Sequence, residues 1–206
     1  LSTNSPTVVR RLHQTFKAKG IQMLDAPVSG GTYGAATRDL SVMVGGDRAT
    51  YERIKPVLDG IGDKVVYCGD IGSGSVCKIV NNLTTMGVAV LLGEALTLGV
   101  KAGVSTKTLF EVLQKSSGNT RRMESRFPRF LFKGNFQPSF SLELSAKDVH
   151  LATELGKELK LPMEVSNLIE QRYIEAMSRG WGPMDTDIVV TLQEERAGVQ
   201  LRIPDL

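Results

Sequence analysis

The residues best suited to chemistry lie in the segment GSGSVCKIVNN, residues 72–82. Lys78 stands among apolar neighbours, and Asn82 follows four residues later, so on a helix the two side chains share a face. A lysine that extends to solvent beside a polar neighbour is one interpretation. The other is an amine partly withdrawn from water, where the charged form is disfavoured and the group can take and give a proton. Asn82 would then orient the substrate or the lysine.

A second candidate is the loop PVSGG, residues 27–31, which follows an expected strand. Glycines allow a backbone to approach a ligand closely, and exposed N–H groups in such a loop can bind a carboxylate. Ser29 adds a hydroxyl group. A plain turn is the alternative, and the pattern alone favours it slightly.

The GSGS segment also resembles a dinucleotide-binding turn, because it follows a strand and opens a helix. However, Cys77 stands where the third glycine belongs, and no second strand ending in an acidic residue follows. A flexible joint is the favoured interpretation. Near the other end of the chain, Lys147 and Asp148 predict an ion pair or an acidic group at the start of a helix.

Neither the cysteines nor the histidines predict a metal site. Cys68 and Cys77 lie in different expected elements, so two reduced thiols are expected. His13 and His150 have no metal-ligand spacing around them.

The elements that must position these residues fall into two classes. Up to about residue 70, helices and strands alternate, which is typical of an α/β layer. The expected helices are 6–20, capped by Asn4 or Ser5, and 49–61, interrupted at Pro56; the expected strands are 21–27, 40–46 and 64–69, with a glycine-rich loop at 29–39.

Beyond Gly74 the sequence predicts helices only, at 75–101, 105–115, 121–132, 145–160 and 163–179. The first would be roughly 40 Å long and is apolar on nearly every side, so neighbours must bury it. It contains Glu94 and several glycines, which makes it a poor membrane span. We therefore expect an α/β domain at 1–71 and an all-α domain at 72–206.

Composition narrows the class of protein further. Of 206 residues, 41% are hydrophobic, and the net charge is +3. These values are ordinary for a soluble globular protein and give no reason to expect nucleic acid or an anionic membrane as a partner. The start of the chain does not read as a signal peptide. A cytoplasmic location is expected, with the mitochondrial matrix as the alternative.

Six segments together resemble the β-hydroxyacid dehydrogenases, the family of 3-hydroxyisobutyrate dehydrogenase and tartronate semialdehyde reductase. They are STNSP (2–6), DAPVSGG (25–31), LSVMVGG (40–46), GSGSVCKIVNN (72–82), EALTLGVKAGV (94–104) and FSLELSAKDVHLA (140–152). They occur in the family's order over nearly the whole chain. The resemblance implies the C-terminal part of a Rossmann-like domain, joined by a long helix to a helical domain like that of 6-phosphogluconate dehydrogenase.

The same resemblance implies an oxidoreductase that interconverts a 3-hydroxy acid, such as 3-hydroxyisobutyrate, and its semialdehyde. By resemblance, Lys78 is the catalytic acid and base, and Asn82 holds the substrate. Ser29, Gly30 and Gly31 would bind the substrate carboxylate. The alternatives are a reductase of 2-hydroxy-3-oxopropionate, succinic semialdehyde or glyoxylate, and a non-catalytic helical dimerisation module.

The implied cofactor is NAD or NADP, contacted on the nicotinamide side by Thr3 and Lys147. Family members begin with a strand and a G-x-G-x-x-G turn that holds the pyrophosphate, roughly 90 residues before the position of Leu1. This turn does not occur in the sequence. We therefore expect little activity from the isolated chain, and a homodimer or tetramer that covers the long apolar helix.

Overall fold

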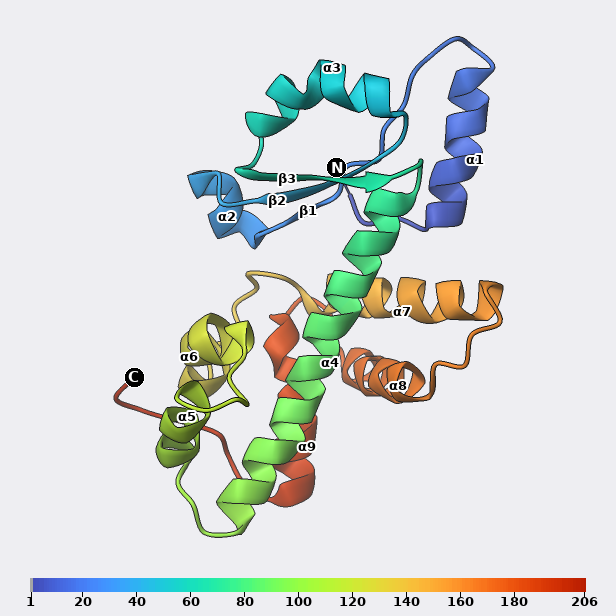
Figure 1. Ribbon diagram of the computed structural model, residues 1–206. Coiled ribbons are helices and arrows are strands. Elements are labelled where there is room, and N and C mark those ends of the chain that lie inside the picture. Colours follow the sequence, from blue (N-terminus) through green and yellow to red (C-terminus); the bar gives the residue numbers. More distant parts are fainter. Residues whose placement is uncertain (1) are drawn as a thin grey trace. The chain divides into compact units, whose positions relative to one another are not determined.

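The computed structural model describes residues 2–206, which form two compact units. The first unit ends at Asn82 and the second spans Leu83–Leu206. Helix α4 (Ser73–Lys101) begins in the first unit and continues into the second (Figure 1). The boundary between the units therefore lies within a helix, and each unit is described by itself.

The first unit contains a sheet of three strands in the order β1 (Val28–Ser29), β2 (Ser41–Gly45), β3 (Lys64–Gly69). Strand β1 is antiparallel to β2, whereas β2 and β3 are parallel. Helix α3 (Arg48–Asp59) makes the crossover between the two parallel strands and lies over one face of the sheet (Figure 1). Such a β-α-β unit is the building block of doubly wound folds.

Apolar side chains between the sheet and α3 form the core of the first unit. Val42 and Val44 of β2 are fully buried, and they pack with Tyr51 and Leu58 of α3. Helix α3 begins at an aspartate cap, where Asp47 accepts hydrogen bonds from Thr50. This packing fixes the position of the sheet. Strand β1 of the sheet lies within the PVSGG loop, and strand β3 leads into α4.

Three expectations for the first unit are wrong in detail. The expected strand 21–27 does not form a regular strand: Asp25 makes an isolated bridge with Gly45, and the Pro27 carbonyl accepts from Met43 N, but Pro27 has no N–H with which to complete the ladder. Part of the expected loop 29–39 is helix α2 (Gly31–Thr37). Helix α3 continues through Pro56 without a break.

The start of the chain folds as expected. Helix α1 (Pro6–Lys17) has Ser5 at its N-cap position and proline as its first residue. The Ser5 side chain makes no capping hydrogen bond.

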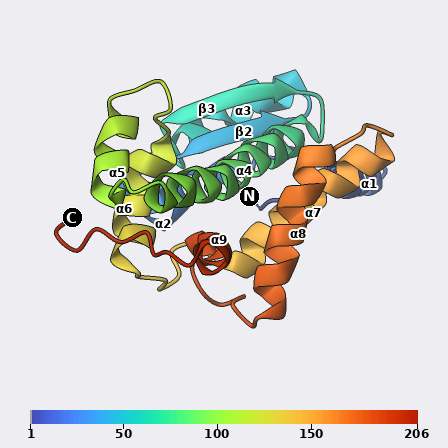
Figure 2. The same ribbon diagram turned by 90° about the horizontal axis from the view of Figure 1, so that it is seen from below.

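The second unit is helical. Its further α-helices are α5 (Thr106–Gln114), α6 (Phe127–Arg129), α7 (Leu142–Glu158), α8 (Glu164–Ser178) and α9 (Thr191–Ala197). Helices α7 and α8 lie side by side, as the two views in Figures 1 and 2 agree. Within the described residues of this unit, strand-like pairing is limited to one bridge between Ser141 and Asp185.

Two helical segments differ from the expectation. The expected helix 121–132 is divided into a π-helical turn (Arg122–Arg126), α6 and a 3-10 turn (Leu131–Lys133). Pro128 lies at the start of α6 and lacks the N–H that a continuous α-helix needs. A 3-10 turn (Thr186–Val190) and α9 were not predicted as separate elements, and Asp185 caps that turn by accepting from Asp187 N.

Helix α4 supplies a central part of the core of the second unit. Met86, Ala89, Leu92 and Leu96 recur at helical spacing and are buried. Among the described residues, α4 is the one helix long and apolar enough to cross a membrane. Core helices of soluble proteins have the same length and composition, so this feature is weak support for a membrane span.

Candidate functional site

Lys78 lies in the second turn of α4 and is buried, with 8% of its surface exposed. Asn82 follows one turn later and is also buried. The surface-lysine interpretation therefore does not describe this residue. An amine withdrawn from bulk water beside a carboxamide is chemically suited to proton exchange with a small polar ligand.

The PVSGG loop has a backbone that needs its glycines. Gly30 has φ of 147°, and a Cβ there would lie 2.6 Å from the carbonyl oxygen of Asp39. Gly31 has φ of 65°, in the left-handed region. Ser29, at the end of β1, is half-buried. The glycines therefore allow the tight turn that follows the Ser29 hydroxyl.

Asn81 joins the loop to α4, and the sequence analysis did not identify it. Its side-chain Nδ2 donates to Ser29 Oγ at 3.4 Å and to Asn82 Oδ1 at 3.0 Å. Asn81 is three residues after Lys78, and this spacing on one helix face was the signal that could have found it. The Asn81 bonds therefore link Ser29 of the loop to Asn82 of α4, and Lys78 lies one turn earlier on the same helix.

The two residues predicted to contact the cofactor lie in different units. Thr3 is partly exposed in the first unit. Lys147 lies in α7 of the second unit, where its Nζ donates to Asp148 Oδ1 at 2.6 Å. The side chain of Lys147 is 43% exposed, whereas that of Asp148 is buried. The expected ion pair is present, and the cofactor role of both residues stays a prediction.

The cysteines of the first unit are free thiols, and Cys77 is the more exposed. Burial raises the pKa of the Cys68 thiol to about 11, and a hydrogen bond with Cys77 adds to this effect. Within residues 2–206 no group of three or more His, Cys, Asp or Glu side chains has a geometry that could hold a metal ion.

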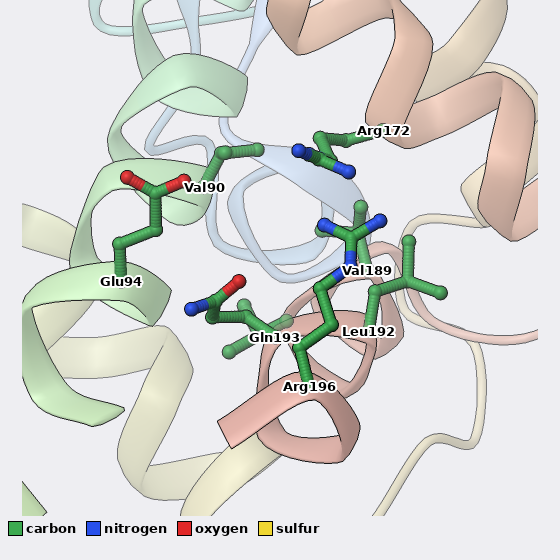
Figure 3. Close-up of a pocket in the computed structure, with 8 residues that line it drawn as sticks. Val90, Glu94, Arg172, Val189, Leu192, Gln193 and Arg196 are labelled. Carbon is green, nitrogen blue, oxygen red and sulfur yellow. The ribbon is translucent and has the colours of Figure 1, made fainter. Parts of the chain in front are cut away.

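A crevice in the second unit lies between α4 and the segment that includes α9 (Figure 3). Glu94 of α4 lines it, as do Arg172 of α8 and Arg196 of α9. Both arginines donate to Glu175, so their charge is already paired. None of the residues predicted to act on a substrate lines this crevice.

Buried charges in the second unit form a network that the sequence analysis missed. Asp187 accepts hydrogen bonds from Arg122 and Arg126, and Asp185 accepts one from Arg126 at 2.6 Å. Both carboxylates are fully buried. The network joins the π-helical turn to the 3-10 turn, and we assign it to stability.

Comparison with known families covers almost the whole chain. Residues 72–192 match the family model described as NAD-binding of NADP-dependent 3-hydroxyisobutyrate dehydrogenase. Residues 1–69 match the NAD binding domain of 6-phosphogluconate dehydrogenase. The chain belongs to the β-hydroxyacid dehydrogenase family. The expected architecture, the far part of a Rossmann-like domain followed by a helical domain, is thereby confirmed.

Several relatives of this β-hydroxyacid dehydrogenase are dehydrogenases of small hydroxy acids. The 2-(hydroxymethyl)glutarate dehydrogenase of Eubacterium barkeri is 38% identical, with 98% of this chain and 67% of the relative covered. The NAD-dependent L-serine dehydrogenase of Pseudomonas aeruginosa is 32% identical, with 96% and 68% covered. Mycobacterium tuberculosis 3-hydroxyisobutyrate dehydrogenase, solved with L-serine, superposes with a TM-score of 0.85 at 31% identity, with 93% and 67% covered.

The β-hydroxyacid dehydrogenase chain therefore spans about two thirds of the length of these relatives. The two family models meet between residues 69 and 72, close to the expected domain boundary, whereas the compact units divide after Asn82. The family-level chemistry is NAD- or NADP-dependent oxidation and reduction of hydroxy acids.

The residues of the chain fit such a cofactor in part. The parallel β2–α3–β3 unit is of the kind that carries nucleotides. A G-x-G-x-x-G turn does not occur within residues 1–206. The described residues therefore include a nucleotide-binding type of β-α-β unit but not the turn that holds the pyrophosphate.

Proposed function

We propose that this chain carries the substrate half of the active site of an NAD- or NADP-dependent dehydrogenase that interconverts a 3-hydroxy acid and its semialdehyde. The observation that carries the proposal is the position of Lys78. It is buried on the face of α4 that also holds Asn81, and Asn81 donates to Ser29 of the PVSGG loop. An amine, a carboxamide and a serine hydroxyl suit a small alcohol that bears a carboxylate.

Lys78 is the proposed acid and base. In the oxidation its neutral amine accepts the proton of the substrate hydroxyl as the carbon–oxygen bond becomes a carbonyl. In the reduction its ammonium group donates that proton to the oxygen and stabilises the negative charge that develops there. The nicotinamide, when bound, accepts the hydride from the alcohol carbon or returns it to the carbonyl carbon.

The loop residues hold the acid end of the substrate. Ser29 Oγ and the backbone N–H groups of Gly30 and Gly31 are the proposed donors to the carboxylate, because glycines leave these amides open to a ligand. Asn82 orients the substrate hydroxyl toward Lys78. These assignments follow from the family resemblance together with the grouping of the side chains.

The test of the proposal uses Lys78→Ala. Turnover is measured on the extended polypeptide, meaning this chain preceded by the G-x-G-x-x-G segment of a family member. Loss of proton transfer should lower kcat by about 100- to 10,000-fold. Unchanged turnover in Lys78→Ala would contradict the proposal. If the chain is instead a non-catalytic helical dimerisation module, the extended polypeptide shows no turnover and Lys78→Ala leaves its assembly unchanged. We expect the 206-residue chain alone to turn over little or not at all.

The substrate is best assigned with a panel of acids. The relatives are named for 2-(hydroxymethyl)glutarate, serine and 3-hydroxyisobutyrate. In all three acids a hydroxymethyl group is attached to the carbon that bears a carboxylate. We therefore propose a 3-hydroxy acid such as 3-hydroxyisobutyrate. Succinic semialdehyde, glyoxylate and 2-hydroxy-3-oxopropionate complete the panel as the alternatives.

We also propose that the chain forms a homodimer or tetramer and acts in the cytoplasm or mitochondrial matrix. The assembly is supported by apolar side chains of α4 that remain exposed in the second unit. Leu91 is 65% exposed and Leu98 is 71% exposed, and their spacing of seven residues puts them on one face.

A further inference from the structure

The carboxylate of Asp25 attaches the start of α4 to the edge of the sheet. Asp25 is buried, and both of its oxygens are used. Oδ1 accepts the backbone N–H of Gly72 at 2.7 Å. Oδ2 accepts the backbone N–H of Ser75 at 2.6 Å and the Ser75 hydroxyl at 2.9 Å. An aspartate from a distant segment therefore serves as the cap of this helix.

The chemistry of a helix start explains why an acid is suited to this place. The first N–H groups of a helix have no partner within the helix, and negative charge is favoured beside them. The residue before α4 is Gly72, which has no side chain with which to satisfy them. The Asp25 carboxylate supplies both the acceptors and the charge.

Two glycines make this close approach possible. A Cβ on Gly74 would lie 2.3 Å from the carbonyl oxygen of Met43 and 3.0 Å from Asp25 Oδ2. A Cβ on Gly45 would lie 2.5 Å from Asp25 Oδ1. The start of α4 is therefore packed against the sheet and is not the flexible joint that its glycines suggested.

The residues of this attachment are close in sequence to the PVSGG loop and to Lys78. Asp25 is four residues before Ser29, and Ser75 is three residues before Lys78, about one helical turn. At the far end Asn81 donates to Ser29. Two contacts therefore hold α4, one from Asp25 to Ser75 and one from Asn81 to Ser29. Together they limit how far the helix can shift along its axis or rotate about it relative to the PVSGG loop.

We propose that Asp25 is a positioning residue for Lys78. Its carboxylate holds the first turn of α4 so that the Lys78 amine stays buried on the face that Asn81 joins to the PVSGG loop. Asp25 acts through Ser75 and does not itself touch the substrate. The catalytic meaning of this position rests on the function proposed above, whereas the position itself can be measured separately.

Asp25→Asn and Asp47→Asn form a matched pair for the test. An amide has one acceptor oxygen, so Asp25→Asn cannot satisfy the donors on both of its sides. Asp47 caps α3 with a single oxygen, Oδ2, which accepts from Thr50 N and Thr50 Oγ1, so an amide can keep both bonds. The pair therefore separates loss of this particular attachment from the general effect of removing a capping charge.

The measurements are hydrogen exchange of the backbone over residues 72–82 and acetylation of Lys78, both followed by mass spectrometry on the 206-residue chain. For Asp25→Asn we expect exchange in this segment to become about tenfold faster. Acetylation of Lys78 should become about threefold faster, because the amine gains access to water. Lys55 of α3 should keep its rate, and Asp47→Asn should leave Lys78 unchanged.

Three outcomes would overturn the proposal. In the first, hydrogen exchange and acetylation in Asp25→Asn stay at the wild-type rates. In the second, the exchange of β2 and β3 accelerates as much as that of residues 72–82, which would indicate only a general loss of stability. If Asp25→Asn does not fold, Ser75→Ala decides, because it removes only the hydroxyl bond and should accelerate Lys78 acetylation about twofold. Unchanged acetylation in Ser75→Ala would then refute the positioning role.

The extended polypeptide distinguishes this proposal from the proposed function. We expect Asp25→Asn to lower kcat about tenfold while KM for the hydroxy acid changes little, because the misplaced group is the proton-transfer group. If Lys78 becomes accessible in Asp25→Asn but Lys78→Ala keeps full turnover, the catalytic function is refuted and the positioning stands.

Discussion

At the scale of single residues, Asn81 is the clearest addition to the site. Its amide donates to Ser29 and Asn82, so Asn81→Leu removes both bonds at nearly constant volume. A neutral hydrogen bond contributes about 1 kcal/mol, and we therefore expect KM for the hydroxy acid to rise about fivefold in the extended polypeptide. A double-mutant cycle with Ser29→Ala is the control. Strictly additive effects would show that the Asn81–Ser29 bond is not the cause.

The two cysteines give a second prediction at this scale. Burial raises the pKa of Cys68 to about 11, so Cys68 stays a thiol at neutral pH and reacts slowly. Alkylation at pH 7 should therefore label the exposed Cys77 first. Between pH 9 and 11 an unfolded chain loses the Cys68 proton while the folded chain keeps it, so this residue lowers the free energy of unfolding as pH rises through that window. Preferential labelling of Cys68 at pH 7 would contradict this assignment.

At the scale of elements, the buried charges of the second unit hold two irregular turns together. Burial lowers the pKa of the Arg122 guanidinium to about 10, so it remains charged at neutral pH beside Asp187. Asp187→Asn leaves this charge without its partner and should reduce the free energy of unfolding by about 3 to 5 kcal/mol. The measurement is urea denaturation followed by circular dichroism.

The matched control is an exposed pair. Arg48 and Glu52 lie one turn apart on α3, with side chains 63% and 50% exposed. Glu52→Gln should change the free energy of unfolding by about 0.5 kcal/mol or less. Equal effects of the two substitutions would mean that burial does not set the strength of these pairs.

At the scale of the whole molecule, the exposed face of α4 predicts self-association. Leu91→Lys combined with Leu98→Lys should weaken the dimer about tenfold or more, measured by light scattering over a concentration series. Val165→Lys is the control, because Val165 of α8 is 70% exposed and just as apolar but lies on another helix. A monomeric wild-type chain, or an equal effect of Val165→Lys, would refute an interface at Leu91 and Leu98.

Short-range patterns were sufficient for much of this fold. Strand β3 has its expected bounds, and α4, α5, α7 and α8 differ from theirs by a few residues, because hydrophobic periodicity and capping residues act locally. Periodicity did not predict three features: the division of 121–132, the helix at 31–37 and the incomplete strand pairing at 21–27. Each depends on which neighbours the backbone meets, and periodicity carries no such information.

The sequence by itself determined the family and singled out Lys78 as the proposed proton-transfer group, because Lys78 and the PVSGG loop belong to short motifs in a fixed order. Only the tertiary structure decided that Lys78 is buried, that Asn81 reaches Ser29 and that Asp25 caps α4. The last two are contacts between residues far apart in the chain, 52 positions for Asn81 and Ser29 and 50 for Asp25 and Ser75. Such contacts arise only when the sheet brings distant segments together, so local sequence patterns cannot specify them.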